Sequence, residues 1–297
     1  MQFDRIINLK VELANPPPDT GYRGTLDISN LRINFSIYKS QSWSTNTANI
    51  KVWNLSNSNR NQLNQFGDEL RLFAGYRNTS IQQTGPQLLF MGNTSLVSHT
   101  FTQPEIITNF DCGDGEKSLN LILASWSFAP GTPVRTVIQS YADLLGLDIQ
   151  EFSATDNLVY ENGHSYSSLA RNGLDCACKA VGLIASVQNN NLVILKEGIG
   201  SEKPPYEINQ ETGMLGIPER FTDRKQFLYK ALPKNGGAPK PGWKVKTLLR
   251  PDILPGDRIR LRSNRVDIDG IFYVVSIRHE GDNYGNDFQS LLEVRAT

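Results

Sequence analysis

Three histidines are the first candidates for chemistry in this sequence, because imidazole can act as a general base or a metal ligand near neutral pH. His99, His164 and His279 lie in three separate segments. None of them has a second histidine four residues away or a cysteine at a ligand spacing. Catalytic and metal-binding histidines need such partners, so we expect no catalytic and no metal-ligating residue among them.

Two acidic clusters are the next candidates, DCGDGEK at 111–117 and HEGDNYGND at 279–287. A helix-flanked calcium loop needs acids at alternate positions and a closing glutamate, and neither segment supplies that pattern. Asp and Asn side chains in turns commonly accept hydrogen bonds from nearby backbone N–H groups. We therefore favour two structural turns over a cation site, and we expect no metal and no cofactor.

The remaining reactive residues also give no indication of an enzyme. The sequence contains no phosphate-loop motif and no Gly-x-Ser-x-Gly nucleophile elbow. Cys112, Cys176 and Cys178 include one Cys-x-Cys pair and no second pair, so buried free thiols are expected. For Trp43 and Trp53 we favour a role as core or interface anchors over a role as a platform on which a sugar stacks. We predict that the chain is not an enzyme.

Composition limits the partners that the chain can have. Among 297 residues, 39% are hydrophobic, and 30 basic residues balance 30 acidic ones, so neither sequence-specific nucleic acid binding nor attraction to acidic membranes is expected. No run approaches the ~18 apolar residues of a membrane-spanning helix, and the N-terminus alternates like a strand. We expect that the chain does not insert into a membrane and that it is made in a cytosol. Residues 219–265 hold 13 basic and 4 acidic residues, a net of +9, which suits either a solvated loop or an electrostatic docking face or channel lining.

Residues 1–117 are predicted to form β structure. Alternating apolar and polar residues indicate strands with one buried face, and short turns between them are typical of a sandwich or barrel. Residues 15–21, NPPPDTG, are expected to form a loop. The predicted strands are INLKVEL, LRINFSIYKS, ANIKVWNL, DELRLFAGY, QLLFMGNTSLVSHTF and PEIITNFDCGDG.

Residues 118–200 change to a helical period. Thr132 is a candidate N-cap with Pro133 at the first helical position, and Gly146 is a stop signal. A second helix is predicted within 165–183, and an Asn-rich hairpin follows at 184–195. Two helices and a hairpin make a small α+β domain. The buried stripe predicted for the second helix is Leu169, Leu174, Cys178 and Val181.

Residues 201–297 return to a β pattern, with KVKTLL, DRIRLRS, GIFYVVSIRHEG and FQSLLEVRA as strands and 232–243 as a mobile loop. This region resembles the first one weakly. Gly67–Leu72 and Gly256–Leu261 share the pattern Gly-Asp-x-Leu/Ile-Arg-Leu, and each precedes a strand that ends in histidine. Duplication of a β module and coincidence both remain open.

The segment 48–63, ANIKVWNLSNSNRNQL, reads as a strand that runs into a polar cap and a short helix. This segment, the following AGY strand and the LF-x-G strand stand in an order similar to that of phage tail hub proteins. The matching positions are Ala48, Ile50, Val52, Asn54, Leu55, Ser56, Leu72, Ala74, Gly75, Tyr76, Leu89, Phe90 and Gly92. Residues 131–195 resemble the α+β insert of that family, and 248–263 with 270–294 resemble its closing pattern.

The resemblance implies a fold that is mainly β with a small α+β insert. Two tail-tube-like β-barrel or sandwich domains would occupy 1–117 and 201–297, with the α+β domain at 118–200. Hub proteins close the distal end of the tail tube and carry the central spike, and three chains form a ring.

The partners that the resemblance implies are two further copies in a homotrimer, the tail tube or distal tail protein, the spike or tip protein, and the tape-measure protein. The location would be the baseplate of a virion, with a role in DNA ejection and host cell entry. The alternatives are another tail structural protein, such as a tube subunit or distal adaptor, and a module that binds cell-wall glycan.

Overall fold

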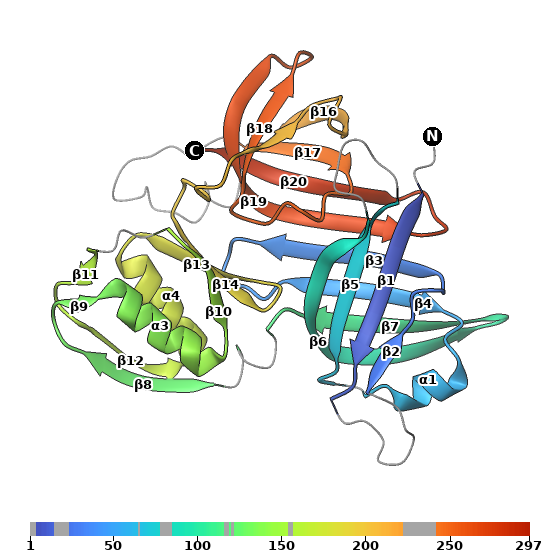
Figure 1. The fold of residues 1–297 in the computed structure, drawn as a ribbon, viewed down its shortest axis with the longest axis horizontal. Coiled ribbons are helices and arrows are strands. Elements are labelled where there is room, and N and C mark those ends of the chain that lie inside the picture. Colours follow the sequence, from blue (N-terminus) through green and yellow to red (C-terminus); the bar gives the residue numbers. More distant parts are fainter. Residues whose placement is uncertain are drawn as a thin grey trace.

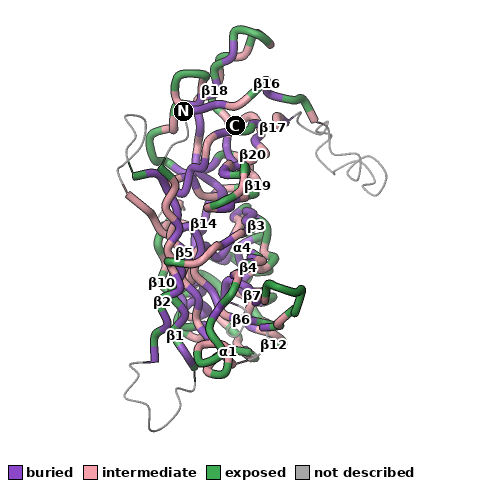
Figure 2. Tube along the Cα trace, turned by 90° about the vertical axis from the view of Figure 1, so that its right-hand side faces the viewer, coloured by how far each residue is buried: buried purple, intermediate pink, exposed green. Residues whose placement is uncertain are grey.

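The computed structural model describes residues 4–14, 24–64, 66–77, 85–115, 119, 122–153, 157–221 and 242–297. A large β-sheet and a separate α+β module make up the molecule (Figure 1). The view turned by 90° shows a flat, elongated body in which buried and exposed residues alternate along the strands (Figure 2). The mainly β fold with a small α+β insert is therefore confirmed. Among the described residues, no helix has the length and apolar character needed to span a membrane.

The first β region contains all six strands that the alternation predicted, and one short strand that it did not, β2. Even-spaced apolar side chains of these strands fill one core, in which Leu9, Phe35 and Ile50 are fully buried. Residues 15–21 lie outside the described residues. The elements are β1 (Arg5–Glu12), β2 (Thr25–Asp27), β3 (Ile33–Ser40), β4 (Thr47–Trp53), α1 (Asn57–Gln62), β5 (Glu69–Tyr76), β6 (Gln87–Thr102) and β7 (Glu105–Gly113).

The polar segment after β4 forms the cap and short helix that its sequence predicts. Asn54 adopts a positive φ of 57°, which ends the strand. The Ser56 hydroxyl accepts the backbone N–H of Asn59 at 3.2 Å and so caps α1. Asn54 also accepts the backbone N–H of Ile106 at 3.1 Å. The polar side chains of Asn54 and Ser56 therefore satisfy backbone groups, which is a structural role.

The α+β module departs from its prediction at both helix starts. The N-cap of the first helix is Pro133, and the Thr132 hydroxyl donates to the Ala129 carbonyl instead of capping. Residues 164–169 form a strand, so the second helix starts only at Ala170. Gly146 ends the first helix with a φ of 67°, as predicted. The elements are β8 (Leu123–Phe128), β9 (Thr132–Pro133), α3 (Val134–Leu145), β10 (Asp148–Phe152), β11 (Val159–Tyr160), β12 (His164–Leu169), α4 (Ala170–Ala180), β13 (Leu183–Gln188) and β14 (Asn191–Lys196).

The buried stripe of α4 also differs from the prediction, because Leu169 and Val181 cap the helix and are only partly buried. The side of α4 that packs in the core is formed by Ala170, Gly173, Leu174, Ala177 and Cys178. The hairpin of β13 and β14 has its predicted Asn turn, in which Asn189 and Asn190 take positive φ angles of 53° and 61°.

The second β region contains the four predicted strands and two more, β15 and β16. Residues 232–241 of the predicted mobile loop lie outside the described residues, whereas residues 242 and 243 begin β17, so the loop prediction is wrong there. The elements are β15 (Tyr206–Ile208), β16 (Met214–Phe221), β17 (Gly242–Leu248), β18 (Arg258–Ser263), β19 (Ile268–Asp282) and β20 (Phe288–Ala296).

One hydrogen-bonded sheet runs through both β regions, in the order β16-β17-β20-β19-β3-β4-β7-β6-β5-β1-β2, with β18 pairing β19 and β15. The two regions meet where β3 pairs β19. Three hydrophobic clusters nevertheless follow the three regions of the sequence closely. The domain boundaries near 117 and 200 stay a prediction.

Candidate assembly interface

The three histidines lie in three different places, and each has one hydrogen-bond partner of its own. His99 Nδ1 lies 3.1 Å from the Thr108 hydroxyl, and His279 Nδ1 lies 2.8 Å from the Ser290 hydroxyl. His164 Nε2 lies 3.2 Å from the Tyr141 hydroxyl. Among the described residues, no three His, Cys, Asp or Glu side chains come together as a metal site.

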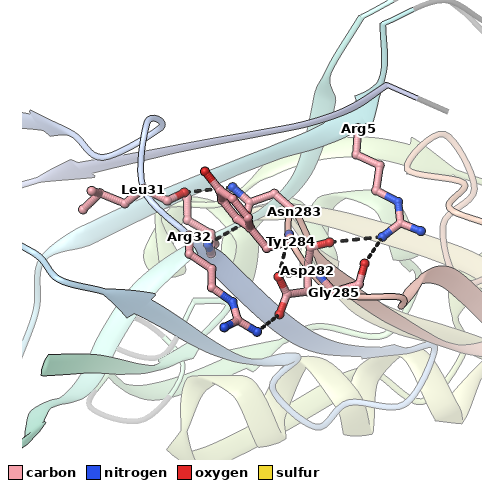
Figure 3. A network of polar contacts seen from close by, with 8 residues as sticks. Arg5, Leu31, Arg32, Asp282, Asn283, Tyr284 and Gly285 are labelled. Carbon is pink, nitrogen blue, oxygen red and sulfur yellow. Dashed lines mark hydrogen bonds and ion pairs between the residues drawn. The ribbon is translucent and has the colours of Figure 1, made fainter. Parts of the chain in front are cut away.

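The acidic cluster at 279–287 forms a turn that joins the two ends of the chain (Figure 3). The Asp282 carboxylate accepts the N–H groups of Tyr284 and Gly285 at 2.8 and 2.9 Å, which confirms the turn interpretation. The same carboxylate pairs with Arg32 at 3.0 Å. Arg5 donates to the carbonyl of Gly285 at 2.6 Å. The turn therefore fastens the second β region to the first.

The other acidic cluster joins the first β region to the α+β module. Asp114 is fully buried, and its carboxylate accepts the N–H groups of Asn189 and Asn190 at 2.6 and 2.7 Å. Lys39, also buried, donates to the Asn189 side chain at 2.7 Å. Burial lowers the pKa of Lys39 to about 8 and raises that of Asp114. These ties hold the Asn turn of the module against β3.

The cysteines and tryptophans take structural positions, with one exception to the prediction. Cys112 and Cys178 are buried free thiols, whereas Cys176 is exposed, so the prediction is wrong for Cys176. Trp43 packs against the core of the α+β module, as an anchor between elements. Trp53 lies beneath the guanidinium of Arg32, 4.4 Å from the ring centre.

The two β regions share one topology. In the first, the chain order is β1, β3, β4, β5, β6, β7 and the sheet order is β3-β4-β7-β6-β5-β1. In the second, the chain order is β15 to β20 and the sheet order is β16-β17-β20-β19, continued by β18 and β15. Position by position the orders are the same. One difference is that β15 runs parallel to β18, while β1 runs antiparallel to β5.

The strand registers of the two units agree as well. In the first unit Glu69 pairs with Asn93, and in the second unit Arg258 pairs with Tyr273. Asn93 of β6 and Tyr273 of β19 therefore correspond, with an offset of 180 residues. The same offset takes His99 to His279, which pair with Thr108 and Ser290 in the adjacent strands. It also takes the β-bulge at Thr94/Leu96 to the bulge at Val274/Ser276.

The shared Gly-Asp motif has the same geometry in both units. Gly67 and Gly256 adopt φ angles of 96° and 95°. Their N–H groups donate to the carbonyls of Thr94 and Val274, the residues before the bulges. Asp68 and Asp257 are buried and accept backbone N–H groups of the preceding turn, at 2.9 and 2.8 Å. Coincidence does not reproduce topology, register, bulge and turn together, so we conclude that the β unit is duplicated.

The junction between the units is a strand pairing along β3 and the second half of β19. It runs from Asn34 opposite Asp282 to Ser40 opposite Ser276. The first half of β19 pairs β18 on the same side, so β3 and β18 lie end to end along one edge of β19. Sequence reasoning missed this junction, although Lys39 on the buried side of β3 was a signal of unusual surroundings.

Solved structures with the same fold include two tail proteins and a component of a type VI secretion system. A tail protein from Neisseria meningitidis MC58 is 10% identical with a TM-score of 0.67, covering 99% of this chain and 97% of that one. The 43 kDa tail protein of prophage MuSo2 from Shewanella oneidensis has the same score and identity, covering 99% and 98%. A component of the E. coli type VI secretion system is 8% identical with a TM-score of 0.59, covering 97% and 76%.

The sequence itself matches one known family, although no curated protein matches the chain. The family is that of the baseplate hub gp41, and the match spans residues 9–223, well over half of the chain. The expected tail hub resemblance and the location in the tail baseplate of a virion are thereby confirmed. This chain belongs to the baseplate hub gp41 family and has a structural role in the tail.

Proposed function

We propose that three copies of this chain form a ring that closes the distal end of the tail tube and adapts its six-fold symmetry to a three-fold spike. The observation that carries the proposal is the duplicated β unit. Three chains with two similar units each present six similar units to the tube and three identical sets of the α+β module to the spike. A chain with a single unit would offer no such change of symmetry.

The partners follow from this arrangement. The face made of β units contacts the tail tube or the distal tail protein, and the ring holds the spike or tip protein, with the tape-measure protein inside the tube. In support, the E. coli type VI secretion component is described as similar to the T4 tail proteins gp27 and gp5. DNA ejection and host cell entry would proceed through the central hole of the ring.

The test is the number of copies in the assembled baseplate. Native mass spectrometry of the purified chain should give a trimer, and an image reconstruction without imposed symmetry should show six similar β units around a hole. A six-copy ring in the baseplate would overturn the proposal. It would also favour a tube subunit or a distal adaptor as the role.

We infer further that the chain has no catalytic activity. Each histidine contacts one hydroxyl group, and Asp114 and Asp282 are occupied by backbone N–H groups. The variants His279→Ala and Asp282→Ala should change stability or assembly only. Hydrolysis of purified peptidoglycan by the wild-type chain, lost in either variant, would contradict this inference. Retention of the chain on purified peptidoglycan, without cleavage, would favour the glycan-binding alternative.

The basic stretch 219–265 is proposed to lie at contacts between subunits or along the channel. Part of its charge is already paired in the described residues, because Arg260 and Arg262 both contact Asp269. Lys244 pairs with Glu293 at 3.0 Å. Its excess positive charge would repel itself less where a neighbour supplies acidic groups.

A further inference from the structure

We propose that strand β16 of one copy pairs with residues 96–102 of β6 in the next copy, in the same way as β3 pairs with β19 inside the chain. The proposal rests on the trimeric ring proposed above and names the surface that builds it. A junction needs two parts, an edge strand such as β3 and an unpaired side of a hairpin strand such as β19. Because the unit is duplicated, the chain has each part twice. Among the residues that the structure describes, one of these two junctions is formed inside the chain.

The position that β3 occupies on β19 has an open counterpart on β6. With the offset of 180 residues, Ser276–Asp282 corresponds to residues 96–102. Residues 96–102 pair with β7 on one side. On the other side, β5 reaches only as far as Asn93, and no described strand pairs with residues 96–102 there. Leu96 and Phe101 are 51% and 71% exposed at this open edge.

The strand that would fill this position is β16. It holds the place in the second unit that β3 holds in the first, and among the described residues its one strand partner is β17. Its outer residues Gly216, Ile217, Glu219 and Arg220 are exposed. β16 lies near the top of Figure 1 and β6 well below it, and β17, β20, β19, β3, β4 and β7 separate them in the sheet, so the two edges cannot meet within a chain.

Exposure at the equivalent positions shows what a covering strand does. Ile277 and His279 of β19, which β3 covers, are 0% and 1% exposed. Their counterparts Val97 and His99 are 7% exposed and partly exposed. The β19–β20 hairpin of the second unit is therefore covered by β3, whereas no described strand covers the equivalent part of the β6–β7 hairpin in the first unit. An open strand edge with exposed apolar side chains needs a partner in a stable particle.

The internal junction fixes the register of the proposed one. Ser36 and Tyr38 of β3 face Glu280 and Arg278 of β19. In β16, Glu219 and Phe221 occupy the places that Ser36 and Tyr38 occupy in β3. Tyr38 pairs with Thr47, which pairs with Gly113. In the second unit, Phe221 pairs with Gly242, which pairs with Arg295, the counterpart of Gly113.

Transferring the internal register by the same offset places Glu219 opposite Thr100 and Phe221 opposite Ser98 of the next copy. Pro218, which lacks an N–H group, precedes this stretch and is compatible with an edge position.

Side-chain sizes at the two junctions are complementary in opposite ways. At the internal junction Phe35 of β3 faces Gly281, where an added Cβ atom would meet the Phe35 ring. The counterpart of Gly281 is Phe101, whose side chain is large and exposed. The register given above places Pro218 of β16 opposite Phe101, within the irregular stretch between Leu215 and Glu219. Each junction therefore pairs one large residue with a smaller one, Phe35 with Gly281 inside the chain and Phe101 with Pro218 between copies, and the large residue is on the other strand.

A cysteine pair placed across the proposed contact tests the register. In a Cys176→Ser background, which removes the exposed thiol, Glu219→Cys and Thr100→Cys put two exposed thiols opposite each other in neighbouring copies. Directly opposite residues of antiparallel strands lie within disulfide range. Oxidation of the purified full chain should give covalent dimers and trimers, and no larger species, in denaturing electrophoresis under non-reducing conditions.

The matched control replaces Glu219→Cys with Glu207→Cys, which is also an exposed residue but lies on β15, at the other edge of the second unit. This control should stay uncross-linked. Native mass spectrometry of the same samples separates the two proposals. A trimer without the 219–100 cross-link overturns the strand pairing and leaves the ring intact. A cross-linked dimer or an open ladder supports the pairing and overturns the three-fold ring, and an uncross-linked monomer overturns both.

Discussion

Acid should weaken this protein through His279. The side chain is 1% exposed, and burial together with the nearby Lys39 charge lowers its pKa from 6.5 to about 3. His279 Nδ1 lies 2.8 Å from the Ser290 hydroxyl, which also accepts the Arg250 N–H at 2.9 Å. A charged imidazole would be shielded from water here and would lie near the Lys39 ammonium, which explains why the native state resists protonation.

The expected magnitude follows from the two pKa values. The unfolded chain binds a proton at His279 below pH 6.5 and the folded chain only near pH 3, so stability is fully present above pH 6.5 and falls as the pH decreases. At pH 5, about 1.5 pKa units below the unfolded value, this histidine alone removes about 2 kcal/mol. Near pH 3 the loss reaches roughly 5 kcal/mol.

The assay is urea unfolding of wild type, His279→Asn and His99→Asn at pH 8 and pH 5, at one protein concentration. Asparagine keeps an acceptor near the position of Nδ1 and does not titrate. The loss of stability between the two pH values should be about 2 kcal/mol smaller in His279→Asn than in wild type. His99 is the matched control, since it has the same kind of hydroxyl partner but is only partly buried, and its variant should change the loss less. Equal losses in wild type and His279→Asn would refute the reasoning.

Three further changes probe the ties between elements. Burial lowers the pKa of Lys39 to about 8, so the folded chain loses this proton at a lower pH than the unfolded chain does. The free energy of unfolding should therefore rise by about 3 kcal/mol between pH 8 and pH 10.5. Urea unfolding of Lys39→Met should show no such rise. Asp282→Ala removes the acceptor of two backbone N–H groups and the ion-pair partner of Arg32, and should lower the free energy of unfolding by about 2–3 kcal/mol. The control Asp287→Ala changes an exposed residue of the same turn and should stay within about 0.5 kcal/mol of wild type. Equal losses in the two variants would contradict the role of the turn. Gly67→Ala should cost about 1–3 kcal/mol for its positive φ, and Gly256→Ala more, because its Cβ would also meet the Leu195 side chain; thermal unfolding in the reverse order would refute the clash.

Local patterns of the sequence predicted much of this fold because they are consequences of local geometry. The alternation in residues 33–40 matches a strand with Ile33, Phe35 and Ile37 inside. The polar residues after Asn54 and the glycine at 146 predicted a cap and a stop, and both are present. Residues 164–169 escaped detection because their strand is largely exposed and polar and pairs with a single neighbour, β8, so no apolar period marks it.

The junctions could not be predicted in this way, because they join residues far apart in the chain. Nothing in the local pattern of β3 or β19 states that the two pair, and their contact closes a loop of more than two hundred residues. One residue did carry a signal. Lys39 follows Ile37 at the inward-facing parity of β3, where a lysine is buried only if it finds a partner. Its partners proved to be Asn189 and the charge of Asp114, in another region of the chain.

The acidic residues that first suggested chemistry share another task. Asp68, Asp114, Asp257 and Asp282 each accept backbone N–H groups in turns where a strand begins or a hairpin ends. A carboxylate whose oxygens accept hydrogen bonds from backbone N–H groups is poorly suited to act as a base or a metal ligand, since its lone pairs are already engaged in those hydrogen bonds. The acids therefore hold strands in position, which is the function expected of a structural protein.

The duplication gives each chain two junction positions and two edge strands, and the chain uses one of each internally. Among the described residues, the counterparts of this junction that stay unpaired are the outer side of β16 and the position beside residues 96–102 of β6. Two unlike surfaces on one molecule lead to head-to-tail association, which either closes into a ring or continues as a filament. If the internal and the external junction impose the same rotation, the number of units in a closed ring is set by the angle between the two units of a single chain. The symmetry of the whole ring would then be encoded in the pairing of β3 with β19.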